Sequence, residues 1–208
     1  MSTFVYLIKL DELSNYYRTL CEICYKKYGY ELDVRNINCA LVQYGLYKEY
    51  GLEKEMVLCK SMKGFPVIQN SEIEISLSHG KKMIGCAISD SYVGLDIQEV
   101  ITCKPEYADF LLSAYEKRLF NKSENKDLYF TIMWTLKEAY GKYLRVGLRY
   151  DFVNTQFNHE LSVEHSIKDV IYKSEQFYES VISCVSKTTS FFYEVGIEEL
   201  LLFLQKTS

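Results

Sequence analysis

The spacing of hydrophobic residues along the chain changes between two periods. A short apolar run near the start, TFVYLIKL, is typical of a strand, and the residues after it place Leu13, Tyr17 and Leu20 on one side of a helix. Alternation with a period of two marks later strands, which glycine and Asp-Ser pairs separate. The predicted strands cover residues 3–10, 56–59, 65–69, 73–78, 82–89, 92–98, 155–164, 169–175, 177–186 and 190–195. The predicted helices cover residues 11–28, 35–49, 106–114, 114–120, 127–144 and 196–205.

Along the chain, a group of helices followed by a group of strands occurs twice. The pattern predicts an α+β fold with two halves, residues 1–100 and 101–208. No internal sequence repeat relates the two halves.

Composition narrows the class of protein. The chain has 208 residues, 48% of them hydrophobic and 25% charged, as in an ordinary globular protein. Its net charge of −4 argues against general nucleic-acid binding. No secretory signal or membrane-spanning run is evident, and seven scattered cysteines do not form a disulfide framework. Cys21 and Cys24 have no second pair at zinc spacing, so we interpret them as packing residues. We expect a cytoplasmic protein with reduced thiols.

The helix predicted over residues 127–144 carries an unusual row of side chains. Trp134, Glu138 and Lys142 recur at helical spacing, roughly opposite the apolar face that contains Leu136 and Tyr143. A solvated face with a Glu–Lys pair is one interpretation. Tryptophan is rarely left in water, so the alternative is that both faces are covered and that the two charged residues lie at the edge of an interface.

The strand in YVGLDIQEV has one apolar face and one polar face. Gly94, Asp96 and Gln98 point to the same side. A glycine beside an aspartate lets a ligand or metal approach the backbone, and oxygens from alternate strand residues suit Mg²⁺. An edge strand with a solvated polar face is the alternative interpretation.

A third feature ends the strand ISLS. Ser78, His79 and Gly80 break its alternation and are followed by two lysines. A histidine at a strand end is commonly structural, but this turn also gathers hydrogen-bond donors that suit a phosphate.

In this order and at this spacing, the three features resemble the Sfp-type 4′-phosphopantetheinyl transferases. That family shows a G-K-P motif, a strand ending in S-H, then G-x-D-x-E and W-x-x-K-E-x-x-x-K. The last motif is matched at every defining position. The matching stretches are GFP (Gly64, Phe65, Pro66), ISLSHG (Ser78, His79), GLDIQ (Gly94, Asp96, Gln98), WTLKEAYGK (Trp134, Lys137, Glu138, Lys142) and the basic stretch KKYGYELDVR (Lys26, Lys27, Asp33, Arg35).

The resemblance implies an enzyme of the holo-[carrier protein] synthase type. It implies transfer of the 4′-phosphopantetheine group from coenzyme A to a serine of an acyl or peptidyl carrier protein, with release of adenosine 3′,5′-bisphosphate. The implied fold has two similar α+β halves related by a pseudo-twofold axis, with coenzyme A in the cleft between them. A monomer is expected, with no nucleic-acid or membrane partner. The carriers of fatty-acid, polyketide and peptide synthesis fit equally well.

The resemblance also implies roles for particular residues. Asp96, Gln98 and Glu138 would hold Mg²⁺. Glu138 would also be the general base, and Lys142 would neutralise charge on the leaving phosphate, with Lys137 a weaker candidate for that role. The remaining residues would bind coenzyme A: Lys26, Lys27, Arg35, Ser78, His79 and Lys142 at its phosphates, and Gly64, Phe65 and Pro66 at its adenine.

Two positions depart from the family pattern. Gln98 stands where the family has a glutamate, and an amide ligand carries no charge. Glu99 is the next residue, but strand alternation points it away from the site with Ile97. Phe65 stands where the family has a lysine. These departures keep open a relative that binds coenzyme A or a carrier protein without transfer. An unrelated Mg²⁺-dependent phosphohydrolase is a third hypothesis.

A surface for the carrier protein is expected over residues 101–126. Lys104, Lys117, Arg118 and Lys122 would face an acidic partner there, or they are ordinary solvated side chains.

Overall fold

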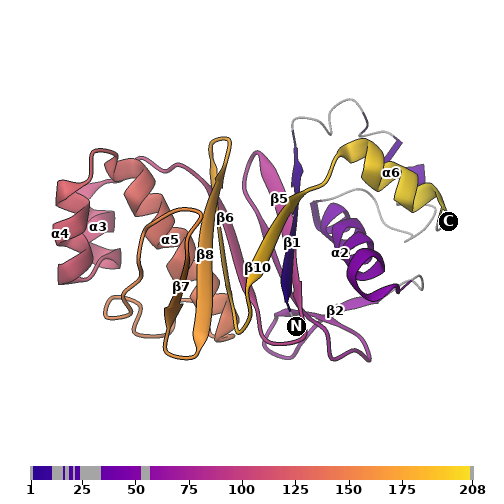
Figure 1. Cartoon of the computed structure of the whole chain (residues 1–208), viewed down its shortest axis with the longest axis horizontal. Coiled ribbons are helices and arrows are strands. Elements are labelled where there is room, and N and C mark those ends of the chain that lie inside the picture. Colours follow the sequence, from indigo (N-terminus) through magenta and orange to yellow (C-terminus); the bar gives the residue numbers. More distant parts are fainter. Residues whose placement is uncertain are drawn as a thin grey trace.

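Two β-sheets lie side by side in the middle of the computed structural model, and helices cover their outer faces (Figure 1). The structure describes residues 2–10, 16, 19–20, 22–23, 34–52 and 57–206, and of residues 34–36 only the backbone. One sheet has the order β10-β1-β5-β4, the other has the order β6-β9-β8-β7, and β2 and β3 form a small separate hairpin. The strands are β1 (Thr3–Lys9), β2 (Leu58–Lys60), β3 (Pro66–Ile68), β4 (Glu74–His79), β5 (Met83–Ser89), β6 (Gly94–Glu99), β7 (Glu164–Ile167), β8 (Val170–Phe177), β9 (Ser180–Ser186) and β10 (Ser190–Glu194).

The helices cover the outside of each sheet. Helices α2 and α6 pack on the first sheet and α5 packs on the second, while α3 and α4 lie beyond α5 (Figure 1). Their bounds are α2 (Val34–Tyr50), α3 (Pro105–Leu111), α4 (Ala114–Lys122), α5 (Lys126–Tyr143) and α6 (Ile197–Lys206). None of the described helices is long and apolar enough to cross a membrane.

Several helix ends follow from local sequence. Helix α2 stops at Gly51, whose φ of 64° suits glycine and whose N–H bonds the carbonyl of Tyr47. Helix α4 begins with a capping box in which Ser113 and Glu116 accept each other's backbone N–H. Helix α5 begins at Asn125, whose side chain accepts the N–H of Leu128.

The inner faces of the two sheets pack directly on each other. Val5 and Leu7 of β1 meet Leu95 of β6 and Ile182 of β9 in one fully buried cluster. A larger apolar cluster fills the space between each sheet and the helices that cover it, so there are two such clusters. Burial of apolar area of this kind is the main stabilising contribution to such a fold.

The two sheets share a strand order but not a simple boundary along the chain. The order β1-β5-β4 in the first sheet repeats as β6-β9-β8 in the second, with antiparallel neighbours in both. Strand β6 precedes residue 100 yet belongs to the second sheet, and β10 pairs in parallel with β1 of the first sheet. The α+β class is confirmed. The division into halves at residues 1–100 and 101–208 stays a prediction. The twofold relation between the halves also stays a prediction.

Most predicted elements agree with the observed ones within a few residues, but the strand predicted over residues 155–164 is wrong. That stretch is irregular, and only Glu164 belongs to a strand. In its middle, backbone N–H groups bond side chains instead of a neighbouring strand: Phe157 N–H donates to the Glu116 carboxylate, and Asn158 N–H donates to the Tyr172 hydroxyl. The helix predicted over residues 11–28 and the Cys21–Cys24 pair lie outside the described residues, apart from isolated helical positions in that range.

Candidate active site

Helix α5 is covered on nearly all sides. Between residues 131 and 143, Trp134, Glu138 and Lys142 are half-buried while every other side chain is buried. Trp134 packs in the core cluster behind the helix and stacks on Phe130. The interpretation with both faces covered is therefore confirmed, and Lys142 of this row lies at the seam where α5 meets β6.

Asp96 meets Lys142 at this seam. Lys142 Nζ lies 2.8 Å from Asp96 Oδ1 and 2.7 Å from the carbonyl oxygen of Leu95, so it bonds both the side chain and the backbone of β6. Ser78 of β4 donates a second bond to the same Oδ1 at 3.1 Å. The described residues give Oδ2 no hydrogen bond. One oxygen of this nearly buried carboxylate is therefore fixed and the other is available to a ligand.

Glu138 is electrostatically coupled to both residues. Burial raises the pKa of the Glu138 carboxyl above its ordinary value, the Asp96 carboxylate raises that pKa further, and Lys142 partly offsets the increase. These contributions indicate that the Glu138 carboxyl of α5 lies near the Asp96 carboxylate of β6. Like charges held together in this way attract a cation.

These residues fit a magnesium ion. Mg²⁺ uses one or two carboxylates together with water and phosphate oxygens, and Asp96 and Glu138 supply two carboxylates. Gln98 lies two residues beyond Asp96 on β6 and is half-buried, so its carbonyl oxygen follows on the same side of the strand. Across the described part of the chain, no three His, Cys, Asp or Glu side chains gather closely enough to hold a metal ion. The donor set is thus two carboxylates and an amide.

The raised pKa of Glu138 predicts a pH-dependent cost to stability. The native state holds the Glu138 proton to a higher pH than the unfolded state, so the free energy of unfolding falls as pH rises through this window. Glu138→Gln should therefore be more stable than the parent protein at pH 7.5, and the difference should shrink at pH 4. Urea denaturation at both pH values measures it. A difference that is the same at both pH values would contradict the electrostatic argument.

Gly94 brings β6 and α5 into contact. A Cβ at this position would lie 1.9 Å from the carbonyl oxygen of Ala139 and 2.6 Å from the backbone nitrogen of Tyr143. The sequence suggested that a ligand approaches the backbone beside Asp96. The structure places the backbone of α5 there instead, and this close approach is what puts Glu138 and Lys142 next to Asp96.

Gly94→Ala should separate the helix from the strand. Because the nearest atoms belong to the backbone, they cannot rotate away, and we expect a loss of about 1–3 kcal/mol in the free energy of unfolding. Gly196→Ala is the matched control, since a Cβ there meets no atom within 4 Å. Denaturant titration of both variants measures the difference, and equal stability of the two would refute the packing argument.

Ser78 links Asp96 to Lys142 and to β6, and its predicted contact with a coenzyme A phosphate stays a prediction. Its hydroxyl proton is directed at Asp96, and its oxygen accepts bonds from Ile97 N–H at 3.1 Å and from Lys142 at 3.2 Å. Ser76 likewise accepts the N–H of Leu95 at 2.9 Å. In this arrangement Ser78 orients Asp96 and closes the seam between β4 and β6.

Lys137 was a weaker candidate for the phosphate, and that prediction is wrong. Its ammonium is fully buried and bonds Glu116 at 2.8 Å and the carbonyl oxygens of Leu111 and Phe152 at 3.0 and 2.7 Å. Burial lowers the pKa of Lys137, and the neighbouring Glu116 carboxylate opposes that shift. Sequence reasoning missed Glu116. The capping-box pattern S-x-x-E at residues 113–116 marks it as an N3 residue but does not show its buried partner.

The other predicted coenzyme A residues that the structure describes belong to the β2–β3 hairpin and to the end of β4. Gly64, with a φ of 84°, lies in the tight turn that joins β2 to β3, and Phe65 and Pro66 follow it. His79 is exposed at the end of β4. No described hydrogen bond or ion pair joins these residues to Asp96 or Glu138. Lys26 and Lys27 lie outside the described residues, as does the side chain of Arg35.

Glu99 points away from Asp96, as strand alternation suggests, and it contacts the turn after β4. Its Oε1 accepts the N–H of Lys82 at 2.8 Å, and its carboxylate lies against Gly80. It therefore holds the turn that follows His79.

Two comparisons with known proteins bear on this site. Residues 92–189 match the family model described as the 4′-phosphopantetheinyl transferase superfamily, and that range contains β6 and α5. The 4′-phosphopantetheinyl transferase psf-1 of Bacillus pumilus is 27% identical over 131 residues, which cover 60% of this chain and 56% of that protein. The resemblance found in the sequence motifs is confirmed. The segment that is similar to the 4′-phosphopantetheinyl transferase superfamily, residues 92–189, carries Asp96, Glu138 and Lys142.

Proposed function

We propose that this protein transfers the 4′-phosphopantetheine group of coenzyme A to a serine hydroxyl of an acyl or peptidyl carrier protein and releases adenosine 3′,5′-bisphosphate. The observation that supports this proposal most strongly is the meeting of Asp96, Glu138 and Lys142, from β6 and α5, within the segment that matches the superfamily. Phosphoryl transfer depends mainly on positioning and on neutralising charge, and these three side chains supply both.

Each residue has a distinct part in the proposed reaction. The carboxylates of Asp96 and Glu138, with the Gln98 amide, would hold Mg²⁺, which when bound polarises the diphosphate of coenzyme A. Glu138 accepts the proton of the serine hydroxyl, and its raised pKa favours this role. The serine oxygen forms a bond to the β-phosphorus, and the bond from that phosphorus to the oxygen bridging it to the adenosine bisphosphate breaks. Lys142 neutralises the charge that develops on the departing phosphate.

A single assay tests the proposal. The protein is incubated with coenzyme A, Mg²⁺ and a panel of apo carrier proteins, and each carrier is weighed by mass spectrometry. A gain of one phosphopantetheine on a carrier is the expected result. Binding of coenzyme A or of a carrier without any mass gain would favour the alternative, a relative that binds without transfer. The neutral Gln98 at the metal-binding position is the observation that keeps this alternative open.

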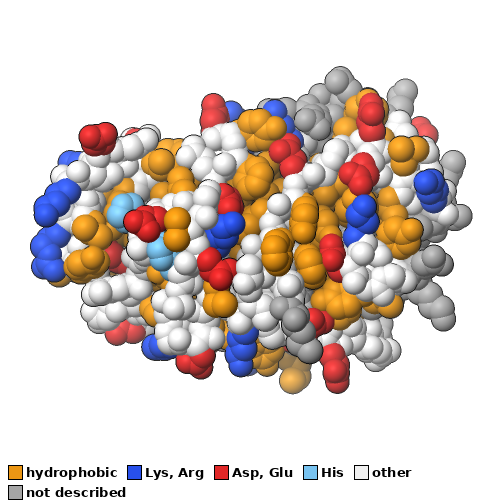
Figure 2. Space-filling model, viewed as in Figure 1, with side chains coloured by type: hydrophobic (Ala, Val, Ile, Leu, Met, Phe, Trp, Pro, Cys, Tyr) orange, Lys and Arg blue, Asp and Glu red, His pale blue; other side chains and the backbone are white. Residues whose placement is uncertain are grey.

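The carrier protein would dock on α3 and α4. The end of the molecule formed by α4 carries Lys and Arg side chains among hydrophobic ones (Figure 2). Tyr107 and Phe110 of α3 and Tyr115 of α4 are about half exposed, and Arg118 lies over the Tyr115 ring. Lys117 is already paired with Asp109, so Arg118 is the better candidate for an acidic partner. Basic and aromatic side chains together suit an acidic helical protein.

Arg118→Glu should weaken carrier binding without affecting coenzyme A. We expect the KM for the carrier to rise about threefold to tenfold at low salt, with the KM for coenzyme A unchanged, because a charge at an interface edge acts mainly on association. Lys168→Glu, a matched charge reversal at an exposed turn of the β7–β8 hairpin, is the control. Equal KM values for the two variants would exclude this face.

A further inference from the structure

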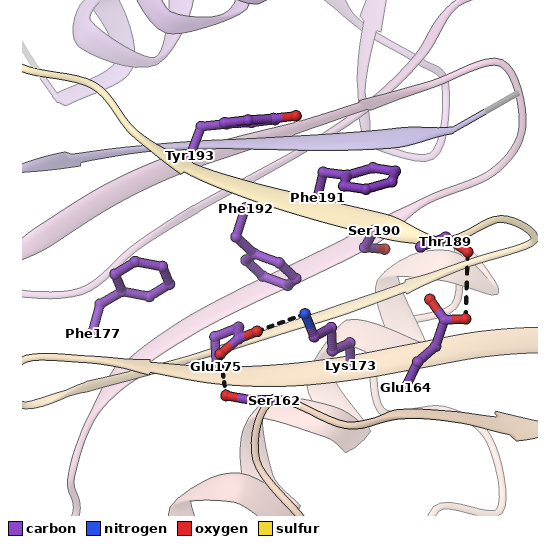
Figure 3. Close-up of a pocket in the computed structure, with 10 residues that line it drawn as sticks. All are labelled: Ser162, Glu164, Lys173, Glu175, Phe177, Thr189, Ser190, Phe191, Phe192 and Tyr193. Carbon is purple, nitrogen blue, oxygen red and sulfur yellow. Dashed lines mark hydrogen bonds and ion pairs between the residues drawn. The ribbon is translucent and has the colours of Figure 1, made fainter.

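A groove lies along β10, at the edge of the first sheet opposite the β4 edge that contacts Asp96. It has a volume of about 550 Å³ and separates β10 of the first sheet from β8 of the second (Figure 3). The candidate active site lies at the opposite edge of the first sheet, where β4 meets β6. The groove is lined by Ser162, Glu164, Lys173, Glu175, Phe177, Thr189, Ser190, Phe191, Phe192 and Tyr193.

The backbone of β10 has one unpaired edge in this groove. Strand β10 is the outermost strand of its sheet and pairs in parallel with β1. The carbonyl of Thr189 accepts the N–H of Thr3, and the N–H of Val195 donates to the carbonyl of Leu7. In a parallel pair, alternate residues of a strand bond the same neighbour, so Thr189 and Val195 mark the residues of β10 that face β1. The N–H and C=O groups of the residues between, Ser190, Phe192 and Glu194, therefore point away from β1. Within the described part of the chain, no other strand pairs with them.

The edge of the second sheet formed by β6 is closed by side chains. Along the edge of β6, the N–H groups of Leu95 and Ile97 bond the hydroxyls of Ser76 and Ser78. Proteins commonly cover or block sheet edges because an open edge is a template for another strand. Strand β10 has no such serines opposite it among the described residues, and a groove large enough for side chains lies there instead.

The side chains around β10 differ on its two faces. Phe191 and Tyr193 project on one face, where they stack on Phe4 and Tyr6 and stay 44% and 43% exposed. The other face opens on polar side chains of the second sheet, and Figure 3 shows Phe192 directed toward Lys173 and Glu175. A strand laid along β10 would therefore meet aromatic rings with every second side chain and charged groups with the alternate ones.

The charges of the groove favour a basic strand. Glu175 is shared by Lys173, at 2.7 Å, and the Ser162 hydroxyl, so that pair is internally balanced. Glu164 lies at the end of the groove with one weak bond from Thr189, and Glu194 ends β10 with bonds from the Tyr178 hydroxyl. The carboxylates of these two residues have no cationic partner among the described residues, so the groove presents a net negative charge.

We propose that β10 is a docking edge for an extended segment of a partner protein in which apolar and basic residues alternate. The segment adds a strand beside β10 and bonds the free N–H and C=O groups of Ser190, Phe192 and Glu194. Its apolar side chains pack against Phe191 and Tyr193, and its basic side chains face Glu164. This proposal does not depend on the transferase reaction.

The test uses the full chain and a labelled peptide in which lysine and valine alternate over seven positions. Fluorescence anisotropy measures binding, and hydrogen exchange measures protection of single amides. We expect saturable binding and slower exchange at the Phe192 and Glu194 amides. A peptide with two central valines replaced by proline should bind at least about tenfold more weakly, because it lacks backbone donors.

Two variants separate strand pairing from charge. Glu194→Pro removes one outward N–H that β1 does not use, and Glu194→Gln removes only the charge. We expect the proline variant to bind clearly more weakly than the glutamine variant, with circular dichroism confirming that both are folded. Equal binding by the two variants, no protection at the two amides, or equal affinity for the proline peptide would overturn the proposal. Dimerisation of the free protein through this edge would also overturn it, because the occupant would then be a second copy.

Discussion

Glu138→Gln should abolish nearly all phosphopantetheinyl transfer while leaving the fold intact. Glutamine has the size of glutamate but can neither accept the serine proton nor contribute charge to a metal ion, so we expect kcat to fall by about 10²–10⁴-fold. The half-buried position of Glu138 beside Asp96 leaves no other described carboxylate to take its place. Initial rates of carrier modification at saturating coenzyme A measure the effect.

The same substitution at an exposed carboxylate is the control. Glu72→Gln changes a solvated side chain before β4 and should keep full activity. Because Glu138→Gln is also expected to be more stable than the parent protein at neutral pH, its inactivity could not be explained by unfolding. An active Glu138→Gln variant would remove Glu138 from the proposed mechanism, and the match of residues 92–189 to the superfamily would still hold.

Lys137→Met should destabilise the fold more than Gly94→Ala does. It leaves the Glu116 carboxylate buried without its cation, and breaking a buried pair in this way costs about 3–5 kcal/mol. The loss should be smaller in the double variant Glu116→Gln/Lys137→Met, because glutamine keeps an acceptor oxygen for Phe157 N–H and removes the uncompensated charge. Urea denaturation of both variants measures the two free energies.

An exposed lysine supplies the comparison. Lys122→Met, in the last turn of α4, should change the free energy of unfolding by less than about 0.5 kcal/mol. If Lys137→Met were as stable as Lys122→Met, the buried pair would not hold α5 against α4. The lysine beside Glu138 would then need another explanation.

The sequence predicts the chemistry at this site better than its architecture. Helical spacing places Glu138 and Lys142 in one row, and strand alternation places Asp96 opposite an apolar face, so both patterns survive in the structure. Local periodicity cannot show that these two elements meet. Their meeting depends on Gly94, where the backbone of α5 occupies the space of a side chain.

Buried polar groups are the hardest to interpret from sequence. Lys137 lies next to Glu138 in the chain, yet successive helical residues point about 100° apart, and its partners come from α3, α4 and a loop. The stretch 155–164 alternates like a strand, but side chains of Glu116 and Tyr172 accept the N–H groups of Phe157 and Asn158. Both cases depend on side chains distant in sequence, which a periodic pattern does not contain.

The pairing of β10 with β1 has a consequence for how the protein is made. Strand β1 leaves the ribosome well before residues 190–206, which supply its neighbour β10 and the helix that packs on α2. Contacts between such distant positions form slowly. The edge of β1 therefore stays unpaired until β10 has been made. Chaperones that bind unpaired strands would have the longest time to bind at this edge.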